Sequence, residues 1–270
     1  MTQAPSPSPA KPVPATAPTR RDRLRAATTE EITATARRLL VEQGPDAMSL
    51  RAIAREMGMT APGLYRYYDS REELLRHVIA SIFRELSGDV RRAIDEVTLS
   101  AAGAAVARGN AAPEQVRPHL TLKLVAACRA FRRWGLSHKD EFTLLFGVPL
   151  PGLDDGRFDV AEECALEFAT TFYTLFFELW NATHFPVPGP SEIDAGLRAQ
   201  LRRFGRTLGT GAPDGAVLVF LRCWTVLYGA VAMEIFGHLA FALDDPAPMF
   251  EFTLADLARL VGLDYPPPAP

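Results

Sequence analysis

Apolar residues recur at helical spacing along most of this chain, and the clearest short case lies between residues 49 and 68. The first half of that stretch carries four apolar residues at i, i+3, i+4 and i+7, on one helical face: Leu50, Ile53, Ala54 and Met57. Gly58 follows where a helix commonly ends, and Thr60 can cap a new helix that has Pro62 in its first turn. The pattern predicts two short helices joined by a tight turn.

The second of these helices has an outward face that is small at its N-terminal end and aromatic or basic further on: Thr60, Ala61, Gly63, Tyr65, Arg66 and Tyr67. Small side chains allow a helix to approach base edges in the major groove of DNA, and tyrosine and arginine can reach phosphates. The face is therefore typical of a helix-turn-helix whose second helix reads DNA. The stretch alone also fits a helical hairpin whose tyrosines cover a core.

Longer helices are predicted on both sides of this stretch. Upstream, Thr28 and Glu31 form a capping box at the start of an apolar-periodic segment that runs to Gly44. Downstream, Ser70 and Glu73 form a second capping box before a longer segment of the same kind. This order of helices, with the string GLYRYYDSREELL, resembles the N-terminal domain of the TetR/AcrR family of bacterial transcriptional regulators over residues 28–83.

The resemblance implies which residues contact DNA. The segment Thr60–Tyr67 would be the recognition helix, Ser49 and Arg51 would touch the DNA backbone, and Arg71 would hold a phosphate at the start of the next helix. The full DNA-binding set is Ser49, Arg51, Thr60, Ala61, Pro62, Gly63, Tyr65, Arg66, Tyr67 and Arg71. Pro62 and Gly63 depart from the usual pattern, because they leave the groove-facing surface poor in hydrogen-bond donors.

Beyond residue 97, apolar periodicity predicts helices at about 120–138, 141–146, 161–183, 193–208, 216–243 and 249–261. The helix at 161–183 is the most aromatic, and its wide apolar surface predicts burial on two sides. Core packing accounts for most of these side chains, and some are candidates to line a cavity for an apolar or aromatic ligand. The candidate pocket residues are Phe131, Trp134, Phe172, Tyr173, Phe176, Phe177 and Trp180.

The segment predicted as a helix at 216–243 is almost continuously apolar and long enough to cross a membrane. Arg222, Glu234 and His238 argue against insertion, because each central charge costs roughly 2.5–3.5 kcal/mol. A soluble helix this apolar must be covered on nearly all sides, by its own core and by a partner subunit. No membrane association is expected.

Two segments, AFRRWGLSHKDEFTLLFGVPLPG and RCWTVLYGAVAMEIFGHL, resemble the C-terminal domain of a TetR subgroup called WHG-type. The matching positions are Trp224, Tyr228 and Gly229, so the Trp-His-Gly pattern is partly kept. In this family the last two long helices pack against their symmetry mates as a four-helix bundle. The resemblance therefore implies a homodimer with these interface candidates: Leu218, Leu221, Val231, Ile235, Phe250, Leu254 and Leu257.

Composition supports a soluble chain with a basic end. The 270 residues are 48% hydrophobic, enough for a substantial core, and carry a net charge of −3. Residues 20–86 hold 12 arginines and 10 acids, a net of +2, which leaves −5 for the rest. The first 19 residues are rich in Pro, Ala, Ser and Thr and are expected to be disordered. Arg20, Arg21, Arg23 and Arg25 fit equally an arm on DNA phosphates or a solvated tail.

Cysteine usage and missing motifs narrow the function. Cys128, Cys164 and Cys223 lie far apart without disulfide or metal spacing, and the N-terminus has no apolar signal core, so a cytoplasmic location is expected. The sequence contains no P-loop, GxSxG or HExxH pattern, and no strand-linked GxGxxG. No enzyme activity, cofactor or metal is predicted. An enzyme acting on apolar substrates in the aromatic region is a disfavoured alternative.

The sequence thus predicts an all-α homodimer. Its expected parts are a disordered tail (1–19), a three-helix helix-turn-helix DNA-binding domain (20–84), a ligand-binding and dimerisation domain (85–263) and a loose end (264–270). We expect a transcriptional regulator, by family habit a repressor, that binds a near-palindromic operator with reader helices about 34–36 Å apart. A small apolar effector would tilt the helix after residue 70 and release the operator. The alternative is a helical small-molecule-binding or scaffold protein without DNA binding.

Overall fold

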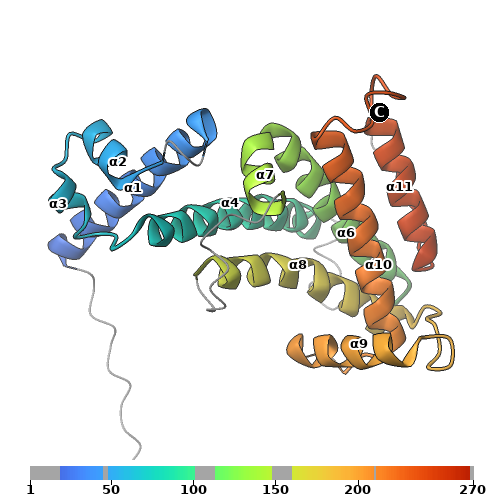
Figure 1. Ribbon diagram of the computed structural model, residues 1–270. Coiled ribbons are helices and arrows are strands. Elements are labelled where there is room, and N and C mark those ends of the chain that lie inside the picture. The colour runs from blue at the N-terminus through green and yellow to red at the C-terminus, as the bar shows by residue number, and fades with distance from the viewer. Residues whose placement is uncertain (1–18, 45–47, 101–112, 148–159, 210, 268–270) are drawn as a thin grey trace, which may run out of the picture. The chain divides into compact units, whose positions relative to one another are not determined.

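The computed structural model describes residues 19–44, 48–100, 113–147, 160–209 and 211–267, and its regular structure within these ranges is entirely helical (Figure 1). The predicted all-α fold class is confirmed. The chain divides into two compact units, Met1–Arg71 and Glu72–Pro270. The predicted disordered tail lies outside the described residues, apart from Thr19.

The first unit contains α1 (Arg20–Gln43), α2 (Leu50–Glu56) and α3 (Ala61–Leu64). Helix α1 begins eight residues earlier than predicted, so the proposed capping box at Thr28 is wrong. The helix starts instead at a capping box in which Thr19 accepts from the backbone of Asp22 and the Asp22 side chain accepts from the backbone of Thr19. Inside the helix the Thr28 hydroxyl donates to the Leu24 carbonyl at 3.0 Å, which satisfies it without a cap.

The core of the first unit is small and apolar. Fully buried side chains come from all three helices and from the residue after the predicted recognition helix (Thr60–Tyr67), here called the reader segment: Ile32, Ala36, Ile53, Leu64 and Tyr68. The Tyr68 hydroxyl lies 2.9 Å from the Thr33 hydroxyl, so its polar end is hydrogen-bonded inside the core. Tyr68 therefore anchors the chain that leaves α3, as its spacing from Leu64 predicts.

The second unit contains α4 (Arg71–Leu99, whose first residue belongs to the first unit), α6 (Pro113–Ser137), α7 (Lys139–Phe146), α8 (Val160–Thr183), α9 (Ala195–Thr207), α10 (Asp214–Ile235) and α11 (Ala247–Leu260). Most bounds lie within two or three residues of those predicted. Helix α6 starts seven residues before the predicted position. Helix α10 ends eight residues early, because the backbone of His238 donates to Met233 and that of Gly237 donates to Glu234, which closes the helix.

Aromatic side chains fill the core of the second unit. The ring of Phe131 in α6 is the centre, within 5.7–6.2 Å, ring centre to ring centre, of five others: Phe142, Phe146, Phe168, Phe172 and Trp224. Helix α4 joins this cluster through Phe83, which lies 6.1 Å from Phe168 of α8. The cluster therefore connects α4, α6, α7, α8 and α10 in one packed group.

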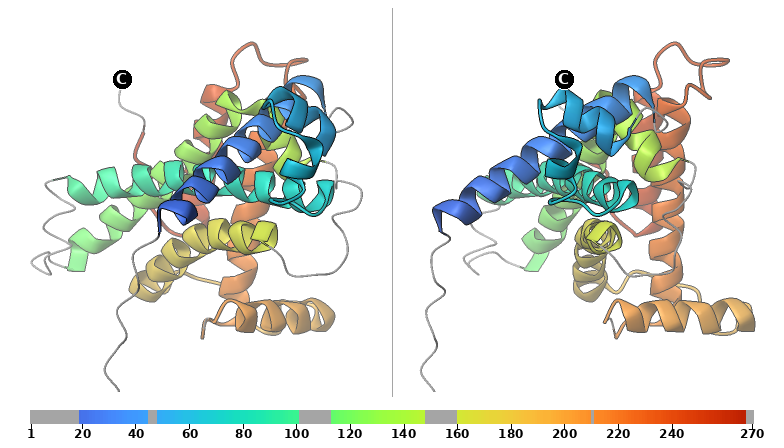
Figure 2. Two further views of the ribbon diagram at one scale, coloured as in Figure 1. Left: turned by 90° about the vertical axis from the view of Figure 1, so that its left-hand side faces the viewer. Right: turned by 60° about the vertical axis from the view of Figure 1, so that its left-hand side comes forward.

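Other helices of the second unit cover one side of helix α10. It packs against α6, α8, α9 and α11, and both views show α9 lying across its N-terminal end (Figure 2). Within the described part of the chain, α10 is the one helix long and apolar enough to span a bilayer. Its Glu234, only 7% exposed, forms a two-bonded ion pair with Arg132 of α6, with N–O distances of 2.5 and 2.6 Å. Its apolar faces therefore pack partly in the subunit core.

Candidate DNA-reading surface and ligand cavity

Local hydrogen bonds fix the two helices of the reader motif. The Ser49 hydroxyl accepts from the backbone of Ala52 at 3.1 Å and caps α2. Helix α2 ends at Glu56, and the turn that follows contains Gly58, whose φ of 65° is in the left-handed region; the Met59 backbone donates back to Ala54 at 2.8 Å. The predicted tight turn is present at the predicted glycine.

Helix α3 is shorter than predicted, with regular helix only at Ala61–Leu64 and turns over the next three residues. The Thr60 hydroxyl caps it by accepting from the Gly63 backbone at 3.2 Å. A Cβ on Gly63 would lie 3.1 Å from that hydroxyl oxygen, so the glycine leaves room for the cap. Leu64 is fully buried and holds the helix on the core.

The predicted DNA-contacting residues all lie in the first unit and differ in exposure. The exposed ones are Ser49, Arg51, Thr60, Pro62, Tyr65 and Arg66. The half-buried ones are Ala61, Gly63, Tyr67 and Arg71. The Arg71 side chain is used internally, since its Nε donates to the Met48 carbonyl at 2.9 Å. A guanidinium nitrogen of Arg71 thus braces the segment that precedes α2.

Sequence reasoning missed the part played by Arg25. In α1, its Nη2 donates to the Arg66 carbonyl at 3.2 Å, and its guanidinium carbon lies 5.3 Å from the ring centre of Tyr67. This cation–π contact and hydrogen bond tie α1 to the end of the reader segment. Arg20, Arg21 and Arg23 are exposed on the first turns of the same helix. The arginine cluster is therefore helical, and its contact with DNA phosphates stays a prediction.

A narrow cavity of about 80 Å³ lies in the second unit among α6, α8, α10 and α11. Its lining is Thr121, Leu124, Val125, Cys128, Phe172, Phe176, Phe220, Cys223, Trp224, Leu227, Leu254, Leu257, Ala258, Val261 and Leu263. Only the threonine, the two cysteines and the tryptophan carry a hydrogen-bonding side-chain group. Such a lining accommodates an apolar guest.

Two of the predicted pocket residues, Phe172 and Phe176, line this cavity. Phe131 lies at the centre of the aromatic core, at 0% exposure, and Trp134, at 2% exposure, stacks on His138. The Tyr173 hydroxyl donates to the Leu208 carbonyl, Phe177 packs on the Tyr173 ring, and Trp180 packs on His184. The lining from α10 and α11 was missed, because the apolar residues of these two helices were predicted to form the dimer interface.

Burial makes the two cavity thiols weak acids. It raises the pKa of Cys128 to about 12 and that of Cys223 to about 12, and the neighbouring thiol adds to the effect at Cys128. Both thiols are therefore protonated at neutral pH and behave as small apolar groups. Among the described residues no group of three or more His, Cys, Asp or Glu side chains is placed to hold a metal.

The predicted interface residues lie mostly inside one subunit. Val231, Ile235, Phe250 and Leu254 are at most 8% exposed. Leu218, Leu221 and Leu257 are half-buried, and Leu257 lines the cavity. The large apolar side chains that α10, its final turn and α11 do expose are different ones: Val226, Met233, Phe236, Met249 and Phe252. One face of each helix packs inward and another faces solvent.

A capped helix-turn-helix followed by a separate helical unit defines a class of protein, the DNA-binding transcriptional regulators. Comparison with known proteins identifies the family. Residues 32–78 match the model described as bacterial regulatory proteins, tetR family, and residues 124–257 match the tetracycline repressor-like C-terminal domain. The chain belongs to the TetR family.

Individual relatives agree with this assignment. The HTH-type transcriptional regulators Rv1816 of Mycobacterium tuberculosis and Mb1846 of Mycobacterium bovis are each 27% identical over 225 residues, covering 80% of this chain and 84% of theirs. The crystal structure of the regulatory protein SCO4313 superposes with a TM-score of 0.61 at 28% identity, covering 88% of this chain and 98% of that one. The matched families and relatives are regulators rather than enzymes.

Proposed function

We propose that this regulator is a cytoplasmic, homodimeric repressor that leaves its operator when a small apolar effector enters the cavity of the second unit. The observation that carries the proposal is the cavity itself, whose lining comes from four helices and offers few hydrogen-bonding groups. A narrow site of this composition favours a small apolar molecule and would bind a charged one poorly.

The exposed reader surface supports the DNA-binding half of the proposal. The N-terminal end of α3 presents small side chains to solvent, and Tyr65 and Arg66 follow at its C-terminal end. In this arrangement the small end approaches base edges, and the tyrosine and arginine reach the phosphates on either side. The exposed arginines on the first turns of α1 add positive charge.

Regulators of this family form dimers, and the exposed apolar residues on α10 and α11 support a partner-facing surface in this chain. Val226, Met233 and Phe236 follow one side of α10 and its final turn, and Met249 and Phe252 lie on α11. Contiguous exposed side chains of this size are typical of an interface. We propose that these residues form the four-helix contact in place of the set predicted from sequence.

Contacts between α8 and α4 support a route from cavity to reader. Phe172 and Phe176 of α8 line the cavity, and α8 also holds α4 through the Phe83–Phe168 ring contact and an Arg91–Glu167 ion pair of 2.6 Å. Helix α4 begins at the third residue after the buried Tyr68. A ligand that shifts α8 would shift α4, with a coupling free energy typically of 1–3 kcal/mol.

The test is a titration of the protein against a labelled fragment of its own upstream DNA, read by fluorescence anisotropy with a shuffled fragment as competitor. Arg66→Ala should weaken binding and lower the slope of log affinity against log salt by about 1. Arg203→Ala is the matched control, because Arg203 is an exposed arginine on helix α9 of the second unit. Equal affinity of both variants and wild type for this DNA would refute the reader assignment.

A further inference from the structure

The chain beyond α11 turns back over the cavity. The Gly262 backbone, with φ of 68°, donates to Arg259 at 3.0 Å, and the Leu263 backbone donates to Ala258 at 2.8 Å. This hydrogen-bond pair reverses the chain and brings the residue after the glycine against the last turns of the helix. We call residues 262–267 the C-terminal strap.

The strap completes the cavity lining. Leu263 of the strap and Val261 just before it line the cavity and are only 7% and 6% exposed. The next three residues of the strap line a second hollow, of about 730 Å³, and Thr121 of α6 lines both spaces. The strap therefore lies at the boundary between the apolar cavity and a solvent-accessible hollow.

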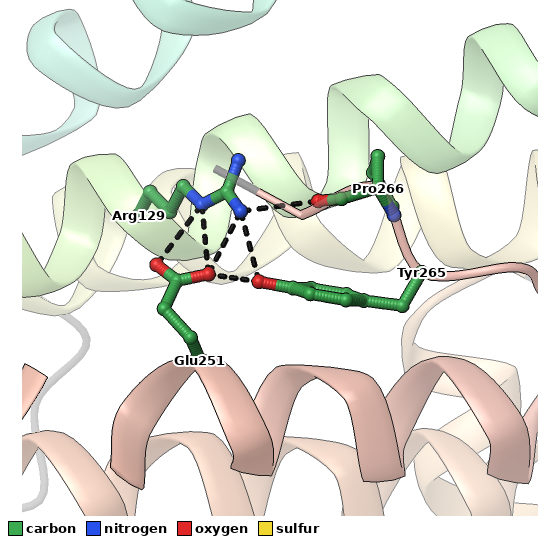
Figure 3. Close-up of polar contacts among 4 residues, drawn as sticks. All are labelled: Arg129, Glu251, Tyr265 and Pro266. Atoms are coloured by element: carbon green, nitrogen blue, oxygen red, sulfur yellow. Dashed lines mark hydrogen bonds and ion pairs between the residues drawn. The ribbon is translucent and has the colours of Figure 1, made fainter. Parts of the chain in front are cut away.

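One cluster of polar contacts holds the strap down (Figure 3). Arg129 of α6 pairs with Glu251 of α11 at 2.8 Å, and the Tyr265 hydroxyl donates to the same carboxylate. Arg129 Nη2 also donates to the Tyr265 hydroxyl at 2.9 Å and to the Pro266 carbonyl at 3.2 Å. Two helices and the strap therefore meet at this point, which we call the latch.

The latch is polar and partly solvated, unlike the packing around the cavity. The Arg129 and Glu251 side chains are 29% and 22% exposed. Burial raises the pKa of Glu251, but hydrogen bonds from Arg129 and Tyr265 outweigh it, so that the net pKa lies below its ordinary value. Burial and the bond to Glu251 both raise the pKa of Tyr265. At neutral pH the carboxylate is charged and the phenol is neutral, as the latch requires.

We propose that the C-terminal strap is the movable part of the effector site, and that Tyr265 is the positioning residue that keeps it closed. This inference rests on the proposed function at one point, namely that the molecule bound in the cavity is the effector. Opening the strap breaks a few half-exposed hydrogen bonds, whereas separating the helices would disrupt the aromatic core, so the strap opens more readily. The strap lies outside residues 124–257, which match the family model.

The two cavity thiols offer a direct test. The full-length protein is incubated with N-ethylmaleimide, and labelling of each cysteine is followed by peptide mass spectrometry. Tyr265→Phe keeps the ring and removes the latch hydroxyl, so Cys128 and Cys223 should label faster, by about tenfold for a lost hydrogen bond to charged partners. Cys164, buried in α8 away from the cavity lining, is the internal control and should label at the wild-type rate.

Tyr228→Phe is the matched variant, because its hydroxyl donates to the Phe146 carbonyl at 2.7 Å and takes no part in the latch. It should leave cavity labelling unchanged. Equal labelling of the cavity thiols in wild type, Tyr265→Phe and Tyr228→Phe would overturn the proposal. Faster labelling of all three cysteines in Tyr265→Phe would also overturn it, because that result indicates general loosening.

A neutral apolar dye, N-phenyl-1-naphthylamine, provides the second measurement. Stopped-flow fluorescence should show faster dye entry and exit in Tyr265→Phe and in Glu251→Gln than in wild type and Tyr228→Phe. Unchanged rates in both latch variants would contradict a moving strap. DNA binding is measured separately on the same proteins. If the latch variants speed dye entry but no apolar ligand weakens operator binding, the proposed regulatory function is refuted and the proposed movement of the strap is supported.

Discussion

The contact of Arg25 with the reader segment predicts a loss of DNA affinity that need not involve any DNA contact by Arg25 itself. Its guanidinium donates to the Arg66 carbonyl at 3.2 Å and lies over the Tyr67 ring. An exposed cation–π contact contributes about 0.5–1 kcal/mol and a hydrogen bond about 0.5–1.5 kcal/mol. Arg25→Ala should therefore loosen the end of the reader by about 1–2 kcal/mol, which corresponds to 5- to 30-fold weaker operator binding.

Salt dependence separates this positioning role from a direct phosphate contact. Affinity is measured by anisotropy at several salt concentrations for wild type, Arg25→Ala and Arg21→Ala. A residue that neutralises a phosphate lowers the slope of log affinity against log salt by about 1, whereas a positioning residue weakens binding at every salt concentration with the slope unchanged.

We expect an unchanged slope for Arg25→Ala and a reduced slope for Arg21→Ala, whose side chain is exposed on the first turn of α1. Tyr67→Ala combined with Arg25→Ala should cost less than the sum of the two single changes, because both remove the same contact. Additive losses, or a slope lowered by one in Arg25→Ala, would refute the reasoning.

Three further predictions concern the second unit. Glu234→Gln should lower the free energy of unfolding in urea by about 1.5–3 kcal/mol, because it removes the counter-ion of Arg132, whose side chain is only 18% exposed, whereas Glu167→Gln in an exposed pair should cost at most about 1 kcal/mol. With pKa values of about 12, the cavity thiols should alkylate at pH 8 roughly a thousandfold more slowly than an ordinary thiol of pKa 9.0. Their alkylation rate should rise tenfold for each unit of pH up to about pH 11, and a pH-independent rate would contradict this. Met233→Glu should yield folded monomers by sedimentation, while Leu254→Glu should unfold the subunit; a stable Met233→Glu dimer would exclude that face.

Local signals in the sequence were enough to place the reader motif. The caps at Ser49 and Thr60 and the turn at Gly58 depend on neighbours within five residues, so their geometry follows from residue type and spacing. Such signals also compete, however. A capping box at Thr19 and one at Thr28 are both written in the sequence, and the upstream box is the one used, because α1 continues unbroken through the second.

The cavity and the apolar surface could not be placed in the same way. Leu254 and Phe252 lie on one short helix, yet the first lines the cavity and the second is 59% exposed. Periodicity identifies that α10 and α11 have apolar faces but cannot say which face meets α6, because both faces are apolar. The contact of Arg25 with residue 66 and the latch at Tyr265 join residues 41 and 136 positions apart, distances at which spacing carries no information.

The scarcity of polar groups around the cavity limits how finely it can distinguish among guests. A site that hydrogen-bonds a substrate rejects an analogue lacking that group by several orders of magnitude, but a hydrocarbon-like site separates neighbours in a series by only about 1–3 kcal/mol for each methylene. Size and shape then become the main criteria for entry. A promoter controlled through such a site would respond in graded fashion to a whole chemical series, and no single compound would be its exclusive effector.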